Sequence, residues 1–305
     1  MRKEWMYYFL AFFTIMVWSF TFVSTKALLL YLSPEEIMFF RFVIAYIVLL
    51  LLHPKFYPVQ NKKTEFYYGL AGFFGGSLYF FTENYALKYT LATNVGLITA
   101  GIPIITAFLA HFMVRGEPLK KQLFIGGILA FIGVAFVIFN GQVVFQISPI
   151  GDLLAGVAAL SFAFYSIFIK LIQTGHSAIY VTRKVFFYSV LTSFPFLIFG
   201  EFTWDLERWI QPVVLGNLFF LGIVASGLCF VVWNQAIYVL GAVKTNHFIY
   251  FVPFLTMLFA WLFLNESITI YALLGSVFII CGVYIAERPE KQLPKKRINH
   301  LKNDT

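Results

Sequence analysis

Residues 123–139 read LFIGGILAFIGVAFVIF. Apolar residues and glycine occupy every position of this stretch, so they would cover the whole circumference of a helix and not one face of it. Residues 39–52 are likewise apolar apart from Arg41, and no polar face with a helical period recurs along the chain. Such helices are typical of a protein embedded in a lipid bilayer.

The composition of the whole chain agrees with that interpretation. Of its 305 residues, 60% are hydrophobic and 12% charged, and the mean hydropathy is +0.82. A water-soluble domain of this size needs much more polar surface. The sequence therefore predicts an all-α integral membrane protein with the lipid bilayer as its main partner.

The number of membrane spans follows from the length that a helix needs. About 20 residues cross the hydrocarbon core, and charges, prolines and glycine clusters divide the chain into ten segments of that length. The first segment lacks a signal-peptide cleavage site, so we expect it to be retained. The predicted spans are 7–26, 35–52, 67–87, 93–114, 122–140, 151–171, 179–199, 213–236, 246–265 and 269–286.

The placement of Lys and Arg predicts the orientation of these spans. If the amino terminus is cytoplasmic, eighteen of the 22 basic residues fall on the inner side. The other four are Lys26, Arg41, Lys88 and Arg208. Because cytoplasmic loops collect basic residues, we expect a multi-pass protein of the cell membrane with both termini in the cytoplasm.

The net charge of +8 does not indicate a nucleic-acid partner. The basic residues lie between apolar spans and in the tail, residues 288–305. Cys229 and Cys281 lie in apolar stretches, where a thiol behaves as a small hydrophobic group. We therefore expect no disulfide, no metal site and no cofactor.

The second half of the chain repeats the first. Pro103 matches Pro253 at an offset of 150 residues. Downstream, an offset of 149 relates Glu117, Gly126 and Gly133 to Glu266, Gly275 and Gly282. Upstream, an offset of 150 relates Gly72, Asn84 and Ala86 to Gly222, Asn234 and Ala236. Several matches at nearly one offset indicate an internal duplication.

This duplication predicts two repeats, residues 1–141 and 142–287, of five transmembrane helices each, followed by a basic cytoplasmic tail. Since five is odd, the second repeat enters the membrane from the opposite side, so the repeats are inverted. Inverted repeats are typical of secondary transporters, in which two equivalent halves exchange conformations and open a central site to either side.

The duplicated residues also resemble a known family. Asn84-Tyr85-Ala86-Leu87 with Ala92, Pro103, Glu117, Gly126 and Gly133, and Asn234 to Ile237 with Ala242, Pro253, Glu266, Gly275 and Gly282, look like the EamA-type family of the drug/metabolite transporter superfamily. This resemblance implies a ten-helix carrier whose cavity is lined by the first, third, fourth, sixth, eighth and ninth helices. It also implies efflux of small metabolites, such as amino acids or amphipathic, drug-like solutes.

Ten residues on those helices are candidates for the cavity. Aromatic walls with few polar groups suit small amphipathic molecules, and a proline inside a helix removes a hydrogen bond and bends it. The alternative for each aromatic residue is simple packing. The candidates are Trp18, Thr21, Tyr79, Glu83, Pro103, Tyr165, Trp233, His247, Tyr250 and Pro253.

Glu83 and Arg41 stand out because an ionisable group at membrane depth is costly unless it is paired or hydrated. One interpretation is a structural ion pair between the two. The other is that Glu83 takes up a proton or binds a cationic group of the substrate. Protons or a counter-solute are the expected energy source, since no GxxxxGK nucleotide-binding loop occurs.

Other functions remain open at this point. Import or exchange of a small metabolite fits the same symmetry, and a homodimer is compatible with the sequence. An intramembrane enzyme would depend on Ser226 and His247, but no nucleophile-elbow or zinc motif accompanies them. A receptor would leave the inverted duplication without a purpose. We therefore expect a transporter and no enzymatic activity.

Overall fold

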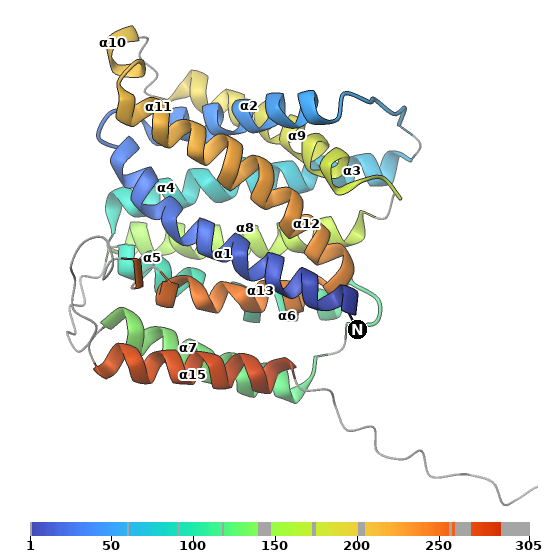
Figure 1. Cartoon of the computed structure of the whole chain (residues 1–305), viewed down its shortest axis with the longest axis vertical. Helices are drawn as coiled ribbons and strands as arrows, with labels where there is room; N and C mark the ends of the chain where they lie inside the picture. The colour runs from blue at the N-terminus through green and yellow to red at the C-terminus, as the bar shows by residue number, and fades with distance from the viewer. Residues whose placement is uncertain are drawn as a thin grey trace, which may run out of the picture.

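The computed structural model describes residues 2–59, 61–90, 92–117, 119–139, 148–172, 175–200, 205–255, 258–259 and 270–287. Throughout these residues the regular structure is helical and no strand occurs. The helices lie side by side in one bundle (Figure 1). The prediction of an all-helical protein is confirmed.

The described residues up to 171 form nine helical segments. They are α1 (Arg2–Leu28), α2 (Pro34–Leu52), α3 (Lys62–Gly72), the π-helix η1 (Phe73–Leu78), α4 (Tyr79–Tyr89), α5 (Ala92–Thr99), α6 (Ile102–Met113), α7 (Lys121–Phe139) and α8 (Pro149–Leu171), of which α8 begins the second predicted repeat.

The remaining segments follow α8 along the chain. They are α9 (Ala178–Phe199), α10 (Leu206–Trp209), α11 (Pro212–Phe219), the π-helix η2 (Phe220–Leu228), α12 (Cys229–Leu240), α13 (Ala242–Asn246), the 3-10 helix η3 (His247–Phe251) and α15 (Ile270–Glu287).

Among the residues that the structure describes, four helical stretches are long and apolar enough to cross a bilayer by themselves. They are Glu4–Thr25, Pro149–Leu171, Ala178–Phe199 and Pro212–Leu240. Shorter apolar helices add Ile102–Met113, Lys121–Phe136 and Leu273–Ala286. The total of ten spans stays a prediction, because the ninth, 246–265, lies partly outside the described residues. Glu266 also lies outside them.

The fourth predicted span, 93–114, is not one bent helix. It is interrupted between α5 and α6 at Ala100 and Gly101, and Pro103 lies in the first turn of α6. The physical reason is that proline is favoured in a first turn, where its missing N–H has no intrahelical partner to lose. Pro103 therefore helps to start a new helix and does not kink a continuous one.

The third predicted span of each half contains a π-helix, and each packs on the second span of the other half. A Cβ on Gly72 would lie 2.8 Å from the carbonyl oxygen of Val185 in α9, and one on Gly222 would lie 2.6 Å from Cγ2 of Ile44 in α2. Only glycine permits both approaches. Two positions related by the duplication thus make reciprocal contacts, which supports the proposed repeats.

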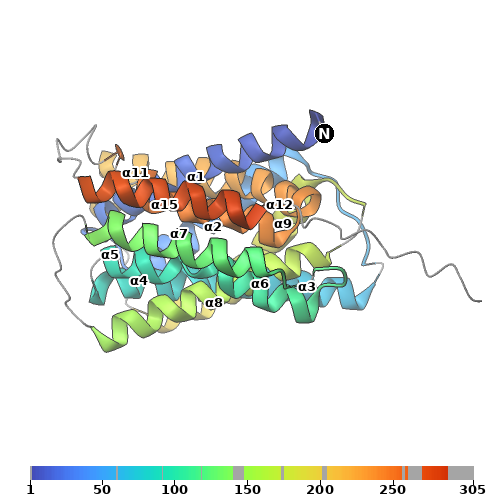
Figure 2. The same ribbon diagram turned by 90° about the horizontal axis from the view of Figure 1, so that it is seen from below.

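Helices α7 and α15 lie against each other at one edge of the bundle, as both views show (Figures 1 and 2). Their glycines form the contact, since a Cβ on Gly282 would lie 2.5 Å from the Gly126 carbonyl oxygen and one on Gly133 would lie 2.5 Å from that of Gly275. These glycines therefore allow the backbones of α7 and α15 to approach closely. The amino terminus and the carboxyl end of α15 lie at the same end of the bundle (Figure 1).

Candidate solute cavity

A cavity of about 60 Å³ lies between α1, α2, α4, α5, α8 and α12. Its apolar wall contains Ile15, Phe22, Phe80, Phe162, Phe230 and Ile249, and its polar groups come from Trp18, Thr21, Arg41, Tyr79, Glu83 and Thr99. This volume holds a few water molecules, whereas sites for drug-sized molecules measure about 300 to 1,000 Å³. A larger solute therefore needs the walls to move apart.

One face of α4 supplies the acidic side of the cavity. Tyr79 and Glu83 are one helical turn apart, and the Tyr79 hydroxyl donates a hydrogen bond of 2.6 Å to Oε1 of Glu83. Glu83 is 7% exposed, so it is a buried carboxyl group at membrane depth. The π-helix η1 ends directly before Tyr79 and so sets the rotation of this face.

Arg41, on α2, supplies the basic side. Its Nε donates a hydrogen bond of 3.0 Å to Oγ of Ser226, which lies in the π-helix η2. The guanidinium carbon lies 4.1 Å from the centre of the Phe80 ring, a favourable cation–π distance. Arg41 is therefore held in place by two neutral neighbours from two different elements.

Arg41 and Glu83 are electrostatic neighbours but not an ion pair. Among the residues that the structure describes, ion pairs join Lys184 to Glu65 and Arg208 to Glu36, and Arg41 with Glu83 is not one of them. Each charged group is anchored by a different partner on its own side of the cavity.

The indole of Trp18 anchors the floor of the cavity. Its Nε1 donates a 2.9 Å hydrogen bond to the carbonyl oxygen of Ala225 in η2. Its ring centre lies 5.0 Å from that of Phe230 and 4.9 Å from that of Trp233. Thr21, one turn further along α1, donates to the Trp18 carbonyl oxygen at 2.7 Å.

Irregular backbone borders the cavity on two sides. Thr99 and Ala100 lie at the interruption between α5 and α6, and Ile249 and Pro253 lie in and just after the 3-10 helix η3. Breaks in the α-helical pattern at membrane depth are tolerated where protein buries them or where they line a cavity. Both irregular segments lie in spans that the duplication relates to each other.

Three of the ten candidates line a different, smaller cavity. Pro103, His247 and Tyr250 surround about 10 Å³ between α6, α7 and η3. The Tyr250 hydroxyl is buried and has no hydrogen-bond partner in the described part of the chain. The volume fits about one water molecule.

Two other candidates lie behind the main cavity. The Tyr165 hydroxyl donates to Oδ1 of Asn234, and the Asn234 amide donates to Oγ1 of Thr182 at 2.9 Å. Trp233 is fully buried against Trp18. Of the ten candidates, the main cavity thus brings together Trp18, Thr21, Tyr79, Glu83 and Pro253, and it adds Arg41.

A groove of about 1,080 Å³ lies beyond the main cavity, towards the end of the bundle that carries α10. Phe22 lines the cavity and Val23 the groove, and on α4 Leu87 of the groove lies one turn after Glu83. Lys88 and Arg208 form the basic part of the groove.

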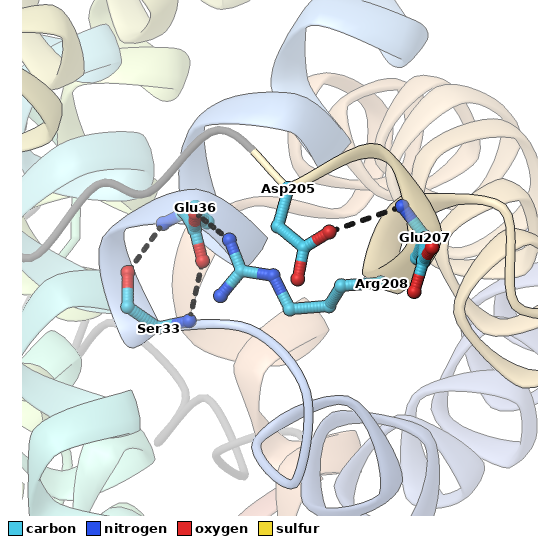
Figure 3. Close-up of polar contacts among 5 residues, drawn as sticks. All are labelled: Ser33, Glu36, Asp205, Glu207 and Arg208. Atoms are coloured by element: carbon cyan, nitrogen blue, oxygen red, sulfur yellow. Dashed lines mark hydrogen bonds and ion pairs between the residues drawn. The ribbon is translucent and has the colours of Figure 1, made fainter.

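Arg208 closes one side of that groove through an ion pair with α2. Its Nη2 lies 2.8 Å from Oε1 of Glu36, and Oε2 of the same carboxylate accepts a 2.7 Å hydrogen bond from the backbone N–H of Ser33 (Figure 3). Ser33 and Glu36 form the capping box that begins α2. The short helix α10 is thereby attached to the first turn of α2.

Sequence reasoning missed Phe162, Phe230 and Ser226 as parts of the site. The chain has 39 Phe, so abundance conceals the two that face the cavity. The sequence suggests Ser226 only as a nucleophile, whereas in the structure its Oγ accepts a hydrogen bond from Nε of Arg41. A signal was present, because a buried arginine in a membrane helix requires polar partners.

The EamA-like transporter family model matches residues 5–139 and again residues 149–287. The transporter YyaM of Bacillus subtilis, which is uncharacterized, is 30% identical, covering 87% of this chain and 88% of the relative. An uncharacterized transporter of Archaeoglobus fulgidus is 25% identical over 92% of this chain and 96% of its own length.

A third relative carries a more specific description. A probable amino-acid metabolite efflux pump of Salmonella typhimurium is 27% identical over 91% of this chain and 93% of its own length. A solved crystal structure superimposes with a TM-score of 0.73 at 20% identity, covering 92% of this chain and 95% of that one. The latter likeness supports the fold alone.

Proposed function

The chain belongs to the EamA-like transporter family, and we propose that it exports small metabolites by secondary active transport through the cavity between α1, α2, α4 and α12. It is a multi-pass membrane protein, and its family and relatives are transporters and not enzymes. Export, alternating access and a metabolite substrate are the parts that we add.

The observation that carries this proposal is the position of the two charged groups. Arg41 and Glu83 lie in one cavity that is bordered by the interrupted span α5–α6 and by the 3-10 helix η3. Interrupted helices at a buried site are typical of carriers, because the free backbone groups bind solute and the short segments move separately. A purely structural helix bundle would not need them.

Alternating access is supported by the reciprocal packing of the two halves. Gly72 contacts α9 and Gly222 contacts α2. If the third span of one repeat shifts against the second span of the other repeat, the same shift is therefore available to the corresponding pair of spans. In the conformation described here, the groove of about 1,080 Å³ lies further along α1 and α4 than the cavity, towards one end of the bundle. We assign this end to the cell exterior, since the predicted cytoplasmic termini lie at the other.

Export is favoured by the description of the Salmonella relative as an efflux pump. Proton exchange is the coupling that fits Glu83 best. A proton that enters from the groove neutralises the carboxylate and releases a cationic group bound to it, and the carboxylate must lose this proton inside before it binds again. Import would use the same site in the reverse direction, and solute exchange would use it in both directions.

The test is counterflow in proteoliposomes with purified protein. Vesicles are loaded with one unlabelled amino acid, aromatic metabolite or cationic drug, and uptake of the labelled compound is followed with and without a pH gradient. We expect saturable counterflow of at least one class. If well-folded protein moves none of them under either condition, carriage of these solutes is excluded.

The enzyme alternative has less support in the site. Ser226 binds Arg41, whereas His247 lines the smaller cavity near Tyr250. These two residues do not converge on a common space, and a serine nucleophile needs its base within hydrogen-bond reach.

A further inference from the structure

A second groove, of about 340 Å³, lies between α3 and α9. These two helices pack against each other (Figure 1), although they belong to different predicted repeats. The groove's lining includes Lys62, Glu65, Phe66, Gly69 and Tyr188, and none of these residues lines the main cavity. The groove is therefore a separate space, which the proposed transport route does not use.

The groove crosses the level at which lipid headgroups meet acyl chains. Lys62 and Glu65 precede the predicted third span, 67–87, whereas Gly69 lies inside it. Tyr188 lies inside the predicted seventh span, 179–199, and the Phe66 side chain is 63% exposed. One end of the groove is thus polar and at the interface, and the other is apolar and within the hydrocarbon.

The polar end carries a cation that no carboxylate offsets. Oε2 of Glu65 lies 2.5 Å from Nζ of Lys184, and Oε1 of Glu65 accepts a hydrogen bond from the Tyr188 hydroxyl. Lys62 is exposed at the rim and takes part in neither of the ion pairs found among the described residues. Because the acidic group is already neutralised, this end of the groove attracts an anion.

The duplication identifies the place in the other half that matches this groove. A Cβ on Gly72 would lie 2.5 Å from Cβ of Tyr188, and one on Gly222 would lie 2.6 Å from Cγ2 of Ile44. The two contacts correspond at an offset of 150 residues for the glycines and 144 for their partners. The same offsets therefore relate the remaining groove residues to their counterparts.

The matching place is apolar. Its side chains carry no charge, and a phenylalanine takes the position of the glycine. The counterparts are Pro212 for Lys62, Leu215 for Glu65 and Phe219 for Gly69. Since α11 still packs on α2 there, packing of the two helices does not require a lysine, a glutamate and a glycine. Their presence in the first repeat alone indicates a ligand.

We propose that the groove between α3 and α9 binds an anionic phospholipid. Its phosphate group lies at Lys62, and one acyl chain lies along Phe66, Gly69 and Tyr188. Lysine side chains at a membrane interface attract anionic headgroups, and the chain gains from burial against two aromatic rings. Because both helices contact the lipid, it holds the two repeats together.

Binding at this site requires both a net negative charge and an acyl chain. Phosphatidylcholine has the same chains and the same phosphate, but its own quaternary ammonium group offsets the phosphate, so Lys62 gains little from it. Inorganic phosphate supplies the charge and makes no contact with the apolar part of the groove. Phosphatidylglycerol supplies both, which makes it the appropriate probe.

The test is thermal unfolding of the purified protein in detergent micelles that contain increasing mole fractions of lipid. Phosphatidylglycerol is compared with phosphatidylcholine of the same chains and with inorganic phosphate. We expect phosphatidylglycerol to raise Tm at a mole fraction about fivefold lower than phosphatidylcholine, the factor for one lysine beside an anionic headgroup. Inorganic phosphate should leave Tm unchanged.

Two variants remove the two parts of the site. Lys62→Gln should abolish the preference for phosphatidylglycerol, so that both lipids act equally. Gly69→Phe introduces the residue type that the second repeat has at Phe219, and it should weaken the effect of both lipids because it fills the groove. In Gly69→Ala the new Cβ would lie 3.9 Å from Cδ1 of Tyr188, an ordinary contact, so this variant should keep the preference.

Lys63→Gln is the matched control for charge. Lys63 follows Lys62 in α3, but it does not line the groove, and its Nζ lies 5.8 Å from the centre of the Tyr67 ring. Its replacement should leave the preference for phosphatidylglycerol at the value of the unmodified protein.

Equal effects of the two lipids on the unmodified protein overturn the proposal, and so does an equal effect of inorganic phosphate. If Lys63→Gln lowers the preference as much as Lys62→Gln, the attraction belongs to the whole surface and the specific site is overturned. Should Gly69→Phe not fold, the comparison of the two lysine variants still decides. All these measurements are made without transport, so a failure of the counterflow assay leaves them unaffected.

Discussion

Nη2 of Arg208 lies 2.8 Å from Oε1 of Glu36, so an ion pair attaches the short helix α10 to the buried first turn of α2. The Glu36 side chain is fully buried, whereas that of Arg208 is 20% exposed. The two residues are far apart in sequence, and their contact links the two predicted repeats at the end of the bundle that carries the groove.

The ion pair predicts that replacing Arg208 and replacing Glu36 lower the stability of the protein by different amounts. Arg208→Gln leaves the buried carboxylate of Glu36 without its cationic partner, and we expect a loss of about 1–3 kcal/mol of stability. Glu36→Gln should cost less, because glutamine at the same position still accepts the hydrogen bond from the Ser33 N–H. Thermal unfolding in detergent measures both, and a larger loss for Glu36→Gln would contradict this assignment.

A second prediction concerns proton coupling at Glu83. If this carboxylate carries the coupled proton, Glu83→Gln abolishes the stimulation of solute flux by an imposed pH gradient while counterflow without a gradient persists. Tyr79→Phe, which removes the hydrogen bond to Oε1, should change the rate but keep the stimulation. The measurement is flux in proteoliposomes as a function of the gradient.

The control for proton coupling is Glu65→Gln, whose carboxylate lies outside the main cavity. It should keep the response to the gradient. If Glu83→Gln still responds like the unmodified protein, the coupled proton binds elsewhere.

A third prediction tests the contact between α7 and α15. A Cβ on Gly282 would lie 2.5 Å from the backbone nitrogen of Ala130, so Gly282→Ala must push the two helices apart and should cost about 1–3 kcal/mol. Gly156, in α8, has no atom within 4 Å of an added Cβ. Gly156→Ala should therefore be neutral or stabilising, by up to about 1 kcal/mol. Equal melting temperatures for the two variants would argue against the close packing.

A fourth prediction tests the orientation in the membrane. Leu30 is 82% exposed in the connection between α1 and α2, and Phe56 is 71% exposed in the connection between α2 and α3. After replacement of Cys229 and Cys281 by alanine, Leu30→Cys should react with a membrane-impermeant maleimide in intact cells. Phe56→Cys should react only after the cells are permeabilised. The opposite pattern would place both termini outside.

The helical character of this chain could be predicted because it depends on composition and period. A stretch such as residues 123–139 is apolar on every side of a helix, and the matches of Pro103 with Pro253 and Gly126 with Gly275 are visible in the printed order of residues. Family membership follows from the same local patterns, and the match of the family model to both halves agrees with it.

The candidate site could be predicted only in part. The depth of Glu83 and Arg41 in the membrane follows from counting residues along each span, and both line the cavity. The same count does not predict their hydrogen-bond partners, Tyr79 and Ser226. Tyr165 and Trp233 were equally good candidates by sequence, yet they lie behind the cavity wall, because the rotation of α8 and α12 about their axes turns them towards other helices.

Sequence by itself thus determined that the chain is helical, suited to the membrane, duplicated and a member of a transporter family, because these properties reside in residue type and spacing. Only the tertiary structure decided that Arg41 binds Ser226, 185 residues away, instead of Glu83. It also decided that the fourth span is interrupted before Pro103. Contacts of this kind depend on how each helix is rotated and how closely its neighbours approach, and packing of the whole bundle determines both.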